Sequence, residues 1–226
     1  MKFKAGKGFD EKIYVEDFNG DLVSLAEFLD GAKLLSVTSY SRVAVTDSEL
    51  HYLYGKDEDG AFSALDNKVD FKFDLAGSKI KLSGDLGSGD DFVKTGSRGS
   101  TIDLGDGRNV FRGGDGKDGV QGGSQADTIH GGGGNDVIRG GGGSDVLSGG
   151  KGSDYFSFEH FDSFDTRITD FKVGEDRLEL NGWSRYDLKI TDTREGVLIR
   201  HVGDDDRILL EGVSKKDLAD FDDWLT

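Results

Sequence analysis

The sequence predicts an all-β solenoid over residues 86–157, with further strands on both sides, and three observations carry this prediction. These residues divide without a gap into eight units of nine residues. The later units converge on the pattern Gly-Gly-x-Gly-x-Asp-x-apolar-x, and the eighth position is apolar in every unit. Because a fixed short period is the signature of a repeat architecture, it sets the fold class before any residue propensity is considered.

Each unit combines a glycine-rich turn with a short strand. Position six carries a short oxygen-bearing side chain in all units: Asp91, Ser100, Asn109, Asp118, Asp127, Asp136, Asp145 and Asp154. The apolar column at position eight is Val93, Ile102, Phe111, Val120, Ile129, Ile138, Leu147 and Phe156. Since each apolar residue stands between two outward-facing ones, the last three positions have the alternation of a strand. Turn and strand therefore alternate, and we expect a flattened coil.

Composition excludes several classes of function. The net charge of −16 argues against general binding to nucleic acid or anionic membrane, since both need a positive surface. The absence of cysteine removes disulfides, thiolate metal sites and cysteine nucleophiles. The opening stretch MKFKAGKGFDEK lacks the apolar core of a signal peptide or membrane span. The sequence thus predicts no membrane span. If the protein is exported, we expect a route that does not use an N-terminal signal peptide.

The turns have the composition of a calcium site. Glycines at positions one, two and four allow positive φ, so a short turn can direct several carbonyl oxygens inward. Calcium accepts six to eight oxygens, carbonyls together with carboxylates, whereas magnesium requires a stricter octahedron. Zinc prefers nitrogen and sulfur, and this chain has no Cys and only four scattered His. The predicted cofactor is therefore Ca²⁺, with several ions per chain.

Other interpretations of the repeats are possible. A single Gly-Gly-x-Gly-x-Asp would more often be a plain turn, but eight units in one frame favour the metal site. A low-complexity linker and an ice-binding solenoid are the alternatives. An ice-binding surface needs a regular outward ladder of Thr or Asn, whereas position seven is mixed: Phe92, Thr101, Val110, Gly119, Thr128, Val137, Val146 and Tyr155.

These nonapeptides resemble the calcium-binding RTX (repeats-in-toxin) family. The resemblance implies a parallel β-roll, a right-handed solenoid with two nonapeptides per coil, flanked by capping strands and short helices. It implies that each ion lies between turns two units apart, held by position-six side chains and by carbonyls at positions one to four. One edge would then stack Asp91, Asn109, Asp127 and Asp145, and the other Ser100, Asp118, Asp136 and Asp154.

The resemblance also implies the remaining metal ligands. Backbone oxygens would come from Gly114, Gly116, Gly123, Gly132, Gly134, Gly141, Gly143, Gly150 and Gly152, and nearby Asp162 and Asp165 would complete the last site. Unit two departs from the pattern with Arg98 at position four and Ser100 at position six, so a full site is not expected there. Gln125 at position four weakens the turn of unit five.

We expect three regions. Residues 1–85 form an N-terminal β-rich cap, or alternatively a small ligand-binding module, with strands over 32–45, 50–55 and 68–85 and a helix over 21–29. Residues 86–157 form the calcium-binding roll. Residues 158–226 form C-terminal capping strands, over 186–193, 196–202 and 207–213, followed by a helix that begins at Ser214 with Asp217 at the capping-box position. Residues 168–182 resemble the segment that follows the roll in secreted RTX proteins.

The RTX resemblance implies type I export from a Gram-negative bacterium to the extracellular medium, directed by a C-terminal signal, here ending in ADFDDWLT. The expected partners are calcium, the type I secretion apparatus, and an extracellular polysaccharide or cell surface.

The chain has no GxSxG, HExxH or phosphate-loop motif, so we expect a protein that is not an enzyme. One hypothesis is a calcium-dependent adhesin-like or matrix-binding protein. The alternative is the calcium-binding and secretion module of a larger secreted enzyme, such as a polysaccharide epimerase, a lyase or a protease.

Overall fold

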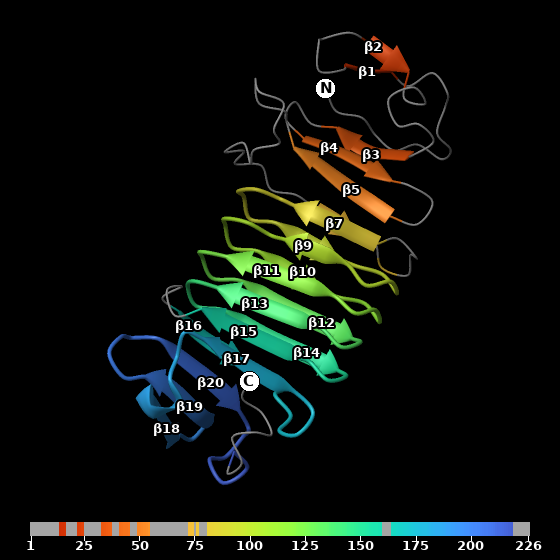
Figure 1. The fold of residues 1–226 in the computed structure, drawn as a ribbon. Coiled ribbons are helices and arrows are strands. Elements are labelled where there is room, and N and C mark those ends of the chain that lie inside the picture. Colours follow the sequence, from red (N-terminus) through yellow and green to blue (C-terminus); the bar gives the residue numbers. More distant parts are fainter. Residues whose placement is uncertain are drawn as a thin grey trace.

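The computed structural model describes residues 81–159 and 164–218, Ala76, and the backbone of six strands between Tyr14 and Asp74. Two nine-stranded sheets lie against each other as the two walls of a roll (Figure 1). In addition, β1 (Tyr14–Glu16) and β2 (Leu22–Ser24) pair as a separate antiparallel hairpin. The predicted all-β parallel roll is confirmed.

Sheet I takes its repeat strands from the odd-numbered units. In spatial order it contains β6 (Lys72–Asp74), β8 (Phe92–Lys94), β10 (Val110–Arg112), β12 (Thr128–Gly133), β14 (Val146–Lys151), β16 (Asp165–Ile168), β20 (Arg207–Glu211), β19 (Gly196–His201) and β18 (Leu188–Asp192). Its strands pair in parallel from β6 to β20, and β18, β19 and β20 pair antiparallel as predicted for the C-terminal strands.

Sheet II takes its repeat strands from the even-numbered units. In spatial order it contains β3 (Lys33–Val37), β4 (Ser41–Val45), β5 (Glu49–Tyr54), β7 (Lys81–Asp85), β9 (Thr101–Asp103), β11 (Gly119–Gly123), β13 (Val137–Gly141), β15 (Tyr155–Glu159) and β17 (Arg177–Asn181). The strands from β5 to β17 are parallel, whereas β3, β4 and β5 are antiparallel. Both sheets continue across the boundaries predicted at residues 85 and 157.

The register of the sheets explains the nine-residue period. Phe111 pairs with Val93 and Ile129 in sheet I, and Val120 pairs with Ile102 and Ile138 in sheet II. Successive strands of one sheet are therefore two units apart, because the intervening unit supplies the opposite wall. All eight position-eight side chains are buried between the walls, which makes the apolar column the core of the roll.

The C-terminal end of the roll is closed by aromatic packing. The Phe164 ring lies 5.0 Å from Phe158 and stacks on Trp183 at 5.6 Å, measured between ring centroids. Ile199, Ile208 and Leu210 of the antiparallel strands are fully buried beside them. In solenoids a terminal element of this kind covers an apolar end that would otherwise face water.

The predicted helices differ from what the structure contains. The helix expected over 21–29 is wrong at Leu22–Ser24, because these residues form β2 and pair with β1. Within the described residues the only helical element is one 3-10 turn, η1 (Arg185–Asp187). The expected contact of the terminal helix start is present, since Ser214 N donates to Asp217 Oδ2 at 3.0 Å. Residues 215–218 form a turn, and the rest of that predicted helix lies outside the described residues.

No helix in this described part of the chain is both long enough and apolar enough to span a bilayer.

Candidate metal centre

Position six of the repeat forms a ladder along each edge of the roll. On the edge of even units, the N–H of Ser100, Asp118 and Asp136 each donates to the Oδ1 atom eighteen residues ahead, at 2.6, 2.8 and 2.9 Å. On the edge of odd units, the corresponding bonds from Asp91, Asn109 and Asp127 measure 2.9, 2.7 and 2.9 Å. We call the edge of the odd units the first edge and the edge of the even units the second edge. Each position-six side chain therefore fixes the turn of the preceding coil.

The other oxygen of these carboxyl groups has no such partner. The Oδ2 atoms of Asp118, Asp127, Asp136 and Asp154 are buried and accept no hydrogen bond within the described structure. A buried carboxylate oxygen without a donor is costly, and buried charges in proteins are paired or bind metal. Three of these oxygens lie on the second edge and that of Asp127 lies on the first, so they fit cations bound along both edges.

Glycine is required in these turns for two different reasons. In unit eight, Gly150 and Gly152 have φ of 97° and 119°, a region that other residues avoid. Position one was expected to share this role, but Gly149 has no positive φ. It is needed because an added Cβ would lie 2.1 Å from Asp154 Oδ2, and at Gly131 the corresponding distance to Asp136 Oδ2 is 2.3 Å. The first glycine makes room for the carboxylate.

The carbonyl oxygens of the turns retain capacity for a ligand. Gly114 O accepts from Gly133 N at 2.7 Å, and Gly123 O accepts from Gly142 N at 2.8 Å. A carbonyl oxygen has two lone pairs, so one backbone bond does not exhaust it. No three His, Asp or Glu side chains of the described residues converge as a metal-binding group. Each candidate site thus consists of one or two carboxylates with backbone carbonyls, a donor set that suits calcium.

Burial strongly perturbs the ladder carboxyl groups. It raises the pKa of Asp118 and Asp127 from 3.8 to about 7, and that of Asp136 to about 6. The N–H bond from the preceding coil opposes this change in pKa, and the charge of the next Asp on the same edge adds to it. A cation beside these groups would favour their charged form and lower the pKa.

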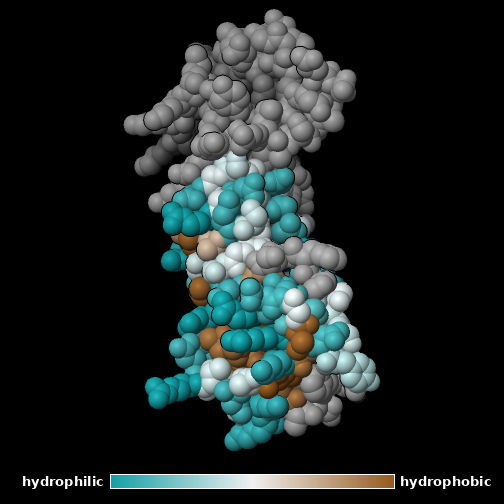
Figure 2. Space-filling view, turned by 90° about the vertical axis from the view of Figure 1, so that its left-hand side faces the viewer, coloured by the Kyte–Doolittle hydropathy of each residue, from teal (hydrophilic) through white to brown (hydrophobic). Residues whose placement is uncertain are grey.

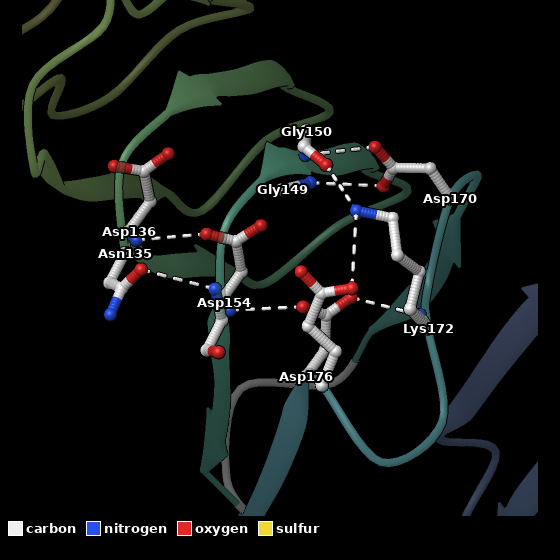
Figure 3. Close-up of polar contacts among 10 residues, drawn as sticks. Asn135, Asp136, Gly149, Gly150, Asp154, Asp170, Lys172 and Asp176 are labelled. Carbon is white, nitrogen blue, oxygen red and sulfur yellow. Dashed lines mark hydrogen bonds and ion pairs between the residues drawn. The ribbon is translucent and has the colours of Figure 1, made fainter.

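Residues 171–179 continue the second edge as a ninth unit, which the sequence analysis did not include among the ligands. Asp154 N donates to Asp176 Oδ1 at 3.0 Å, the same bond that joins the preceding coils (Figure 3). Gly174 has φ of 84°, and Leu178 is fully buried opposite Phe156. The signal was present in the sequence, because Gly174, Asp176 and Leu178 have the spacing of positions four, six and eight.

Asp162 and Asp165 are the two acids predicted to complete the last site, and only Asp165 lies among the described residues. Asp165 is 52% exposed and forms an ion pair with Arg207 at 2.8 Å, at the start of β16. On the first edge the place after Asp145 is taken instead by Thr166, whose Oγ1 lies 3.4 Å from Asp145 Oδ2. Asp162 lies outside the described residues. The ligand roles of both acids remain predictions.

The irregular side chains of units five and two have different surroundings. Gln125 of unit five accepts a hydrogen bond from Gly107 N at 2.6 Å, so its side chain joins two coils. Arg98 of unit two is exposed.

Of the histidines, His130 contacts Ser148 Oγ at 2.6 Å and His201 contacts Asp204 Oδ2 at 2.7 Å.

The repeats of this chain match a known family. Residues 85–120 and residues 121–156 each match the family described as the RTX calcium-binding nonapeptide repeat (4 copies). A similar solved structure is the solution structure of the AlgE6R3 subunit from the Azotobacter vinelandii mannuronan C5-epimerase. The identity is 24% and the TM-score 0.21, over 49% of this chain and 77% of that one. No curated protein matches this chain. The chain therefore carries RTX calcium-binding nonapeptide repeats within a β-roll.

The raised pKa values predict how the calcium-free roll responds to pH. A carboxyl group with a higher pKa in the folded state contributes stability that is complete below the unfolded pKa and is lost as pH rises through the folded pKa. For Asp118 and Asp127 this window runs from 3.8 to about 7. After exhaustive removal of calcium, acidification across this window should therefore increase the far-ultraviolet β signal.

Asp118→Asn should show a smaller gain on acidification, whereas the exposed Asp115→Asn in the same turn should behave as the wild type. A β signal that is constant or falls on acidification would contradict this linkage.

Proposed function

We propose that this chain, whose residues 85–156 are RTX calcium-binding nonapeptide repeats, is a secreted module that folds into its β-roll when several calcium ions bind between the coils. The observation that carries the proposal is the set of buried Oδ2 atoms of Asp118, Asp136 and Asp154 on the second edge and of Asp127 on the first, none of which accepts a hydrogen bond within the described structure. Because calcium is a divalent cation that binds oxygen ligands, it would supply the positively charged partner that these oxygen atoms lack.

The ligands would come from pairs of turns two units apart. On the second edge, Asp118 with Asp136 and Asp136 with Asp154 would hold ions together with carbonyls of the glycine turns. On the first edge the pair is Asp127 with Asp145. When bound, calcium supplies a positive charge that offsets the buried carboxylates. The chain itself supplies the ordered turns, which the Oδ1 ladder holds in register.

Calcium binding would be coupled to folding. A preformed site does not exist in an unfolded chain, so the binding free energy of each ion is also folding free energy. The glycine-rich turns lose much conformational freedom on folding, and the ladder brings like charges together. A medium rich in calcium therefore favours the roll, and a medium without calcium favours the unfolded chain.

Export would make use of this coupling. RTX repeat proteins in general are secreted by type I systems, and low cytosolic calcium would keep these repeats unfolded for passage. We propose that the type I apparatus reads the C-terminal residues of this chain and that the roll forms in the extracellular medium.

A basic column on sheet I suggests a non-catalytic, matrix-binding role. Lys94, Arg112 and His130 are paired side by side on β8, β10 and β12, at an outward-facing position of their strands. The Arg112 guanidinium carbon lies 5.7 Å from the centre of the Phe92 ring. A column of basic groups is unexpected in a chain of net charge −16. We propose that this column contacts an anionic extracellular polysaccharide or cell surface.

Calcium should induce the fold, and Asp136→Asn should weaken the response. In chelator the β signal of the wild type should be small, and it should rise cooperatively on calcium titration. The Asn side chain keeps the Oδ1 acceptor for Asp118 N but removes the charge, so the calcium midpoint should rise by roughly tenfold or more. Asp115→Asn, with the same change of charge on an exposed side chain, should titrate as the wild type.

Circular dichroism and titration calorimetry measure these two quantities. A wild-type chain with full β signal in chelator, or equal midpoints for the two variants, would overturn the proposal.

The basic column should select anionic glycans. Calcium-loaded wild type should bind anionic members of a glycan panel, and Arg112→Gln should reduce this binding several-fold. Arg98→Gln removes the same charge from an exposed turn outside the column and should bind normally. Binding that is absent, or insensitive to Arg112→Gln, would remove the matrix-binding role and leave the alternative of a module in a larger secreted enzyme.

Export should depend on the C-terminal residues. Expressed with a type I channel in a Gram-negative host, the full chain should reach the medium, and a variant without residues 219–226 should remain in the cells. Equal secretion of both, measured by immunoblot of cells and medium, would contradict type I recognition of this segment.

A further inference from the structure

The last turn of the second edge differs from those before it because it contains a lysine. Position two is glycine in all eight repeat units. In the ninth unit, residues 171–179, the same position is Lys172. This turn lies where residues 149–154 of the roll face residues 170–176, beside the C-terminal strands.

The lysine side chain points back at the preceding turn. Its Nζ donates to Gly150 O at 2.6 Å, and its backbone N donates to Asp176 Oδ2 at 2.8 Å. Figure 3 shows the ammonium group directed at Gly150. It also lies 3.8 Å from Glu175 Oε2. Lys172 therefore joins the last turn to the preceding one.

The partner of Gly150 O is different in kind from the partners of earlier carbonyls. At the same position of units four and five, Gly114 O and Gly123 O accept from a backbone N–H of the next coil. At Gly150 the donor is instead a charged ammonium group. In the proposed calcium sites of the repeats, a cation likewise binds to the carbonyl oxygens of the turns.

The charge around this turn explains why a cation is needed there. Asp170 accepts from Gly149 N at 3.0 Å with Oδ1 and from Gly150 N at 2.8 Å with Oδ2 (Figure 3). Asp154 and Asp176 are each 1% exposed, so the two turns gather three acidic side chains, two of which are buried. The Lys172 ammonium brings a positive charge to these acidic turns.

We propose that the Lys172 ammonium is a built-in cation that takes the place of a calcium ion in this last turn. The row of ions on the second edge then ends between Asp136 and Asp154, and the turn beside the C-terminal strands closes without an ion of its own. This inference rests on the proposed calcium binding of the repeats, and it assigns Lys172 the role of limiting the number of ions.

Counting bound ions tests the inference directly. Lys172→Met removes the charge at similar side-chain length, and the full-length variant should bind one more calcium ion per chain than the wild type. Lys172→Arg keeps the charge and should bind the wild-type number. Lys151→Met removes a charge from an exposed side chain of the facing turn and should also leave the number unchanged. Equilibrium dialysis with elemental analysis gives the number, and circular dichroism verifies that each variant is folded.

The outcomes separate this inference from the proposal it rests on. If the wild type binds several ions and folded Lys172→Met binds the same number, Lys172 does not replace an ion and only this inference fails. If Lys172→Met does not fold, Lys172→Gly, which restores the residue found in the eight repeats, decides by the same count. A wild-type chain that binds no calcium overturns both.

Discussion

The structure depends on the carboxyl group at position six of the repeat, whose two oxygens have different roles. At position six, one oxygen accepts the N–H of the preceding coil, and the other is buried beside the first glycine of its own unit. The first interaction holds the coils in register. The second leaves a charge inside the protein that its own chain does not satisfy at Asp118, Asp127, Asp136 and Asp154. The same side chain therefore both builds the roll and makes it dependent on a cation.

Most of the roll could be predicted from the sequence because each unit repeats the same physical problem. The apolar column predicted which face is buried, and the RTX resemblance implied two units per coil. The ninth unit was missed because Asp176 follows Asp154 by 22 residues instead of 18. The segment between these two aspartates includes β16 of the other sheet and is longer than the corresponding segment of the earlier coils. The constant nine-residue period is therefore interrupted before Asp176.

Other features depend on contacts that local sequence patterns do not reveal. The glycine at position one of units four to eight was expected to need positive φ, but it is required because Asp Oδ2 lies close to it, which no backbone propensity reveals. The helix expected at Leu22 has suitable local spacing, but pairing with Tyr14–Glu16 makes Leu22–Ser24 a strand. The Lys172 contact also requires the fold, because Gly150 lies in the preceding coil. Local pattern was reliable for the repeats and weaker at their borders.

The alternation of units between two walls restricts how such a chain can change in length. Removing a single nonapeptide would still leave a continuous repeat, but every later unit would move to the opposite wall. Asp136 and Asp154 would then continue the edge that now holds Asp127 and Asp145, and the C-terminal strands would meet the wrong sheet. Duplication or loss of a full coil of two units avoids this exchange. Evolution of this molecule should therefore proceed in steps of eighteen residues, the separation seen between paired ladder positions.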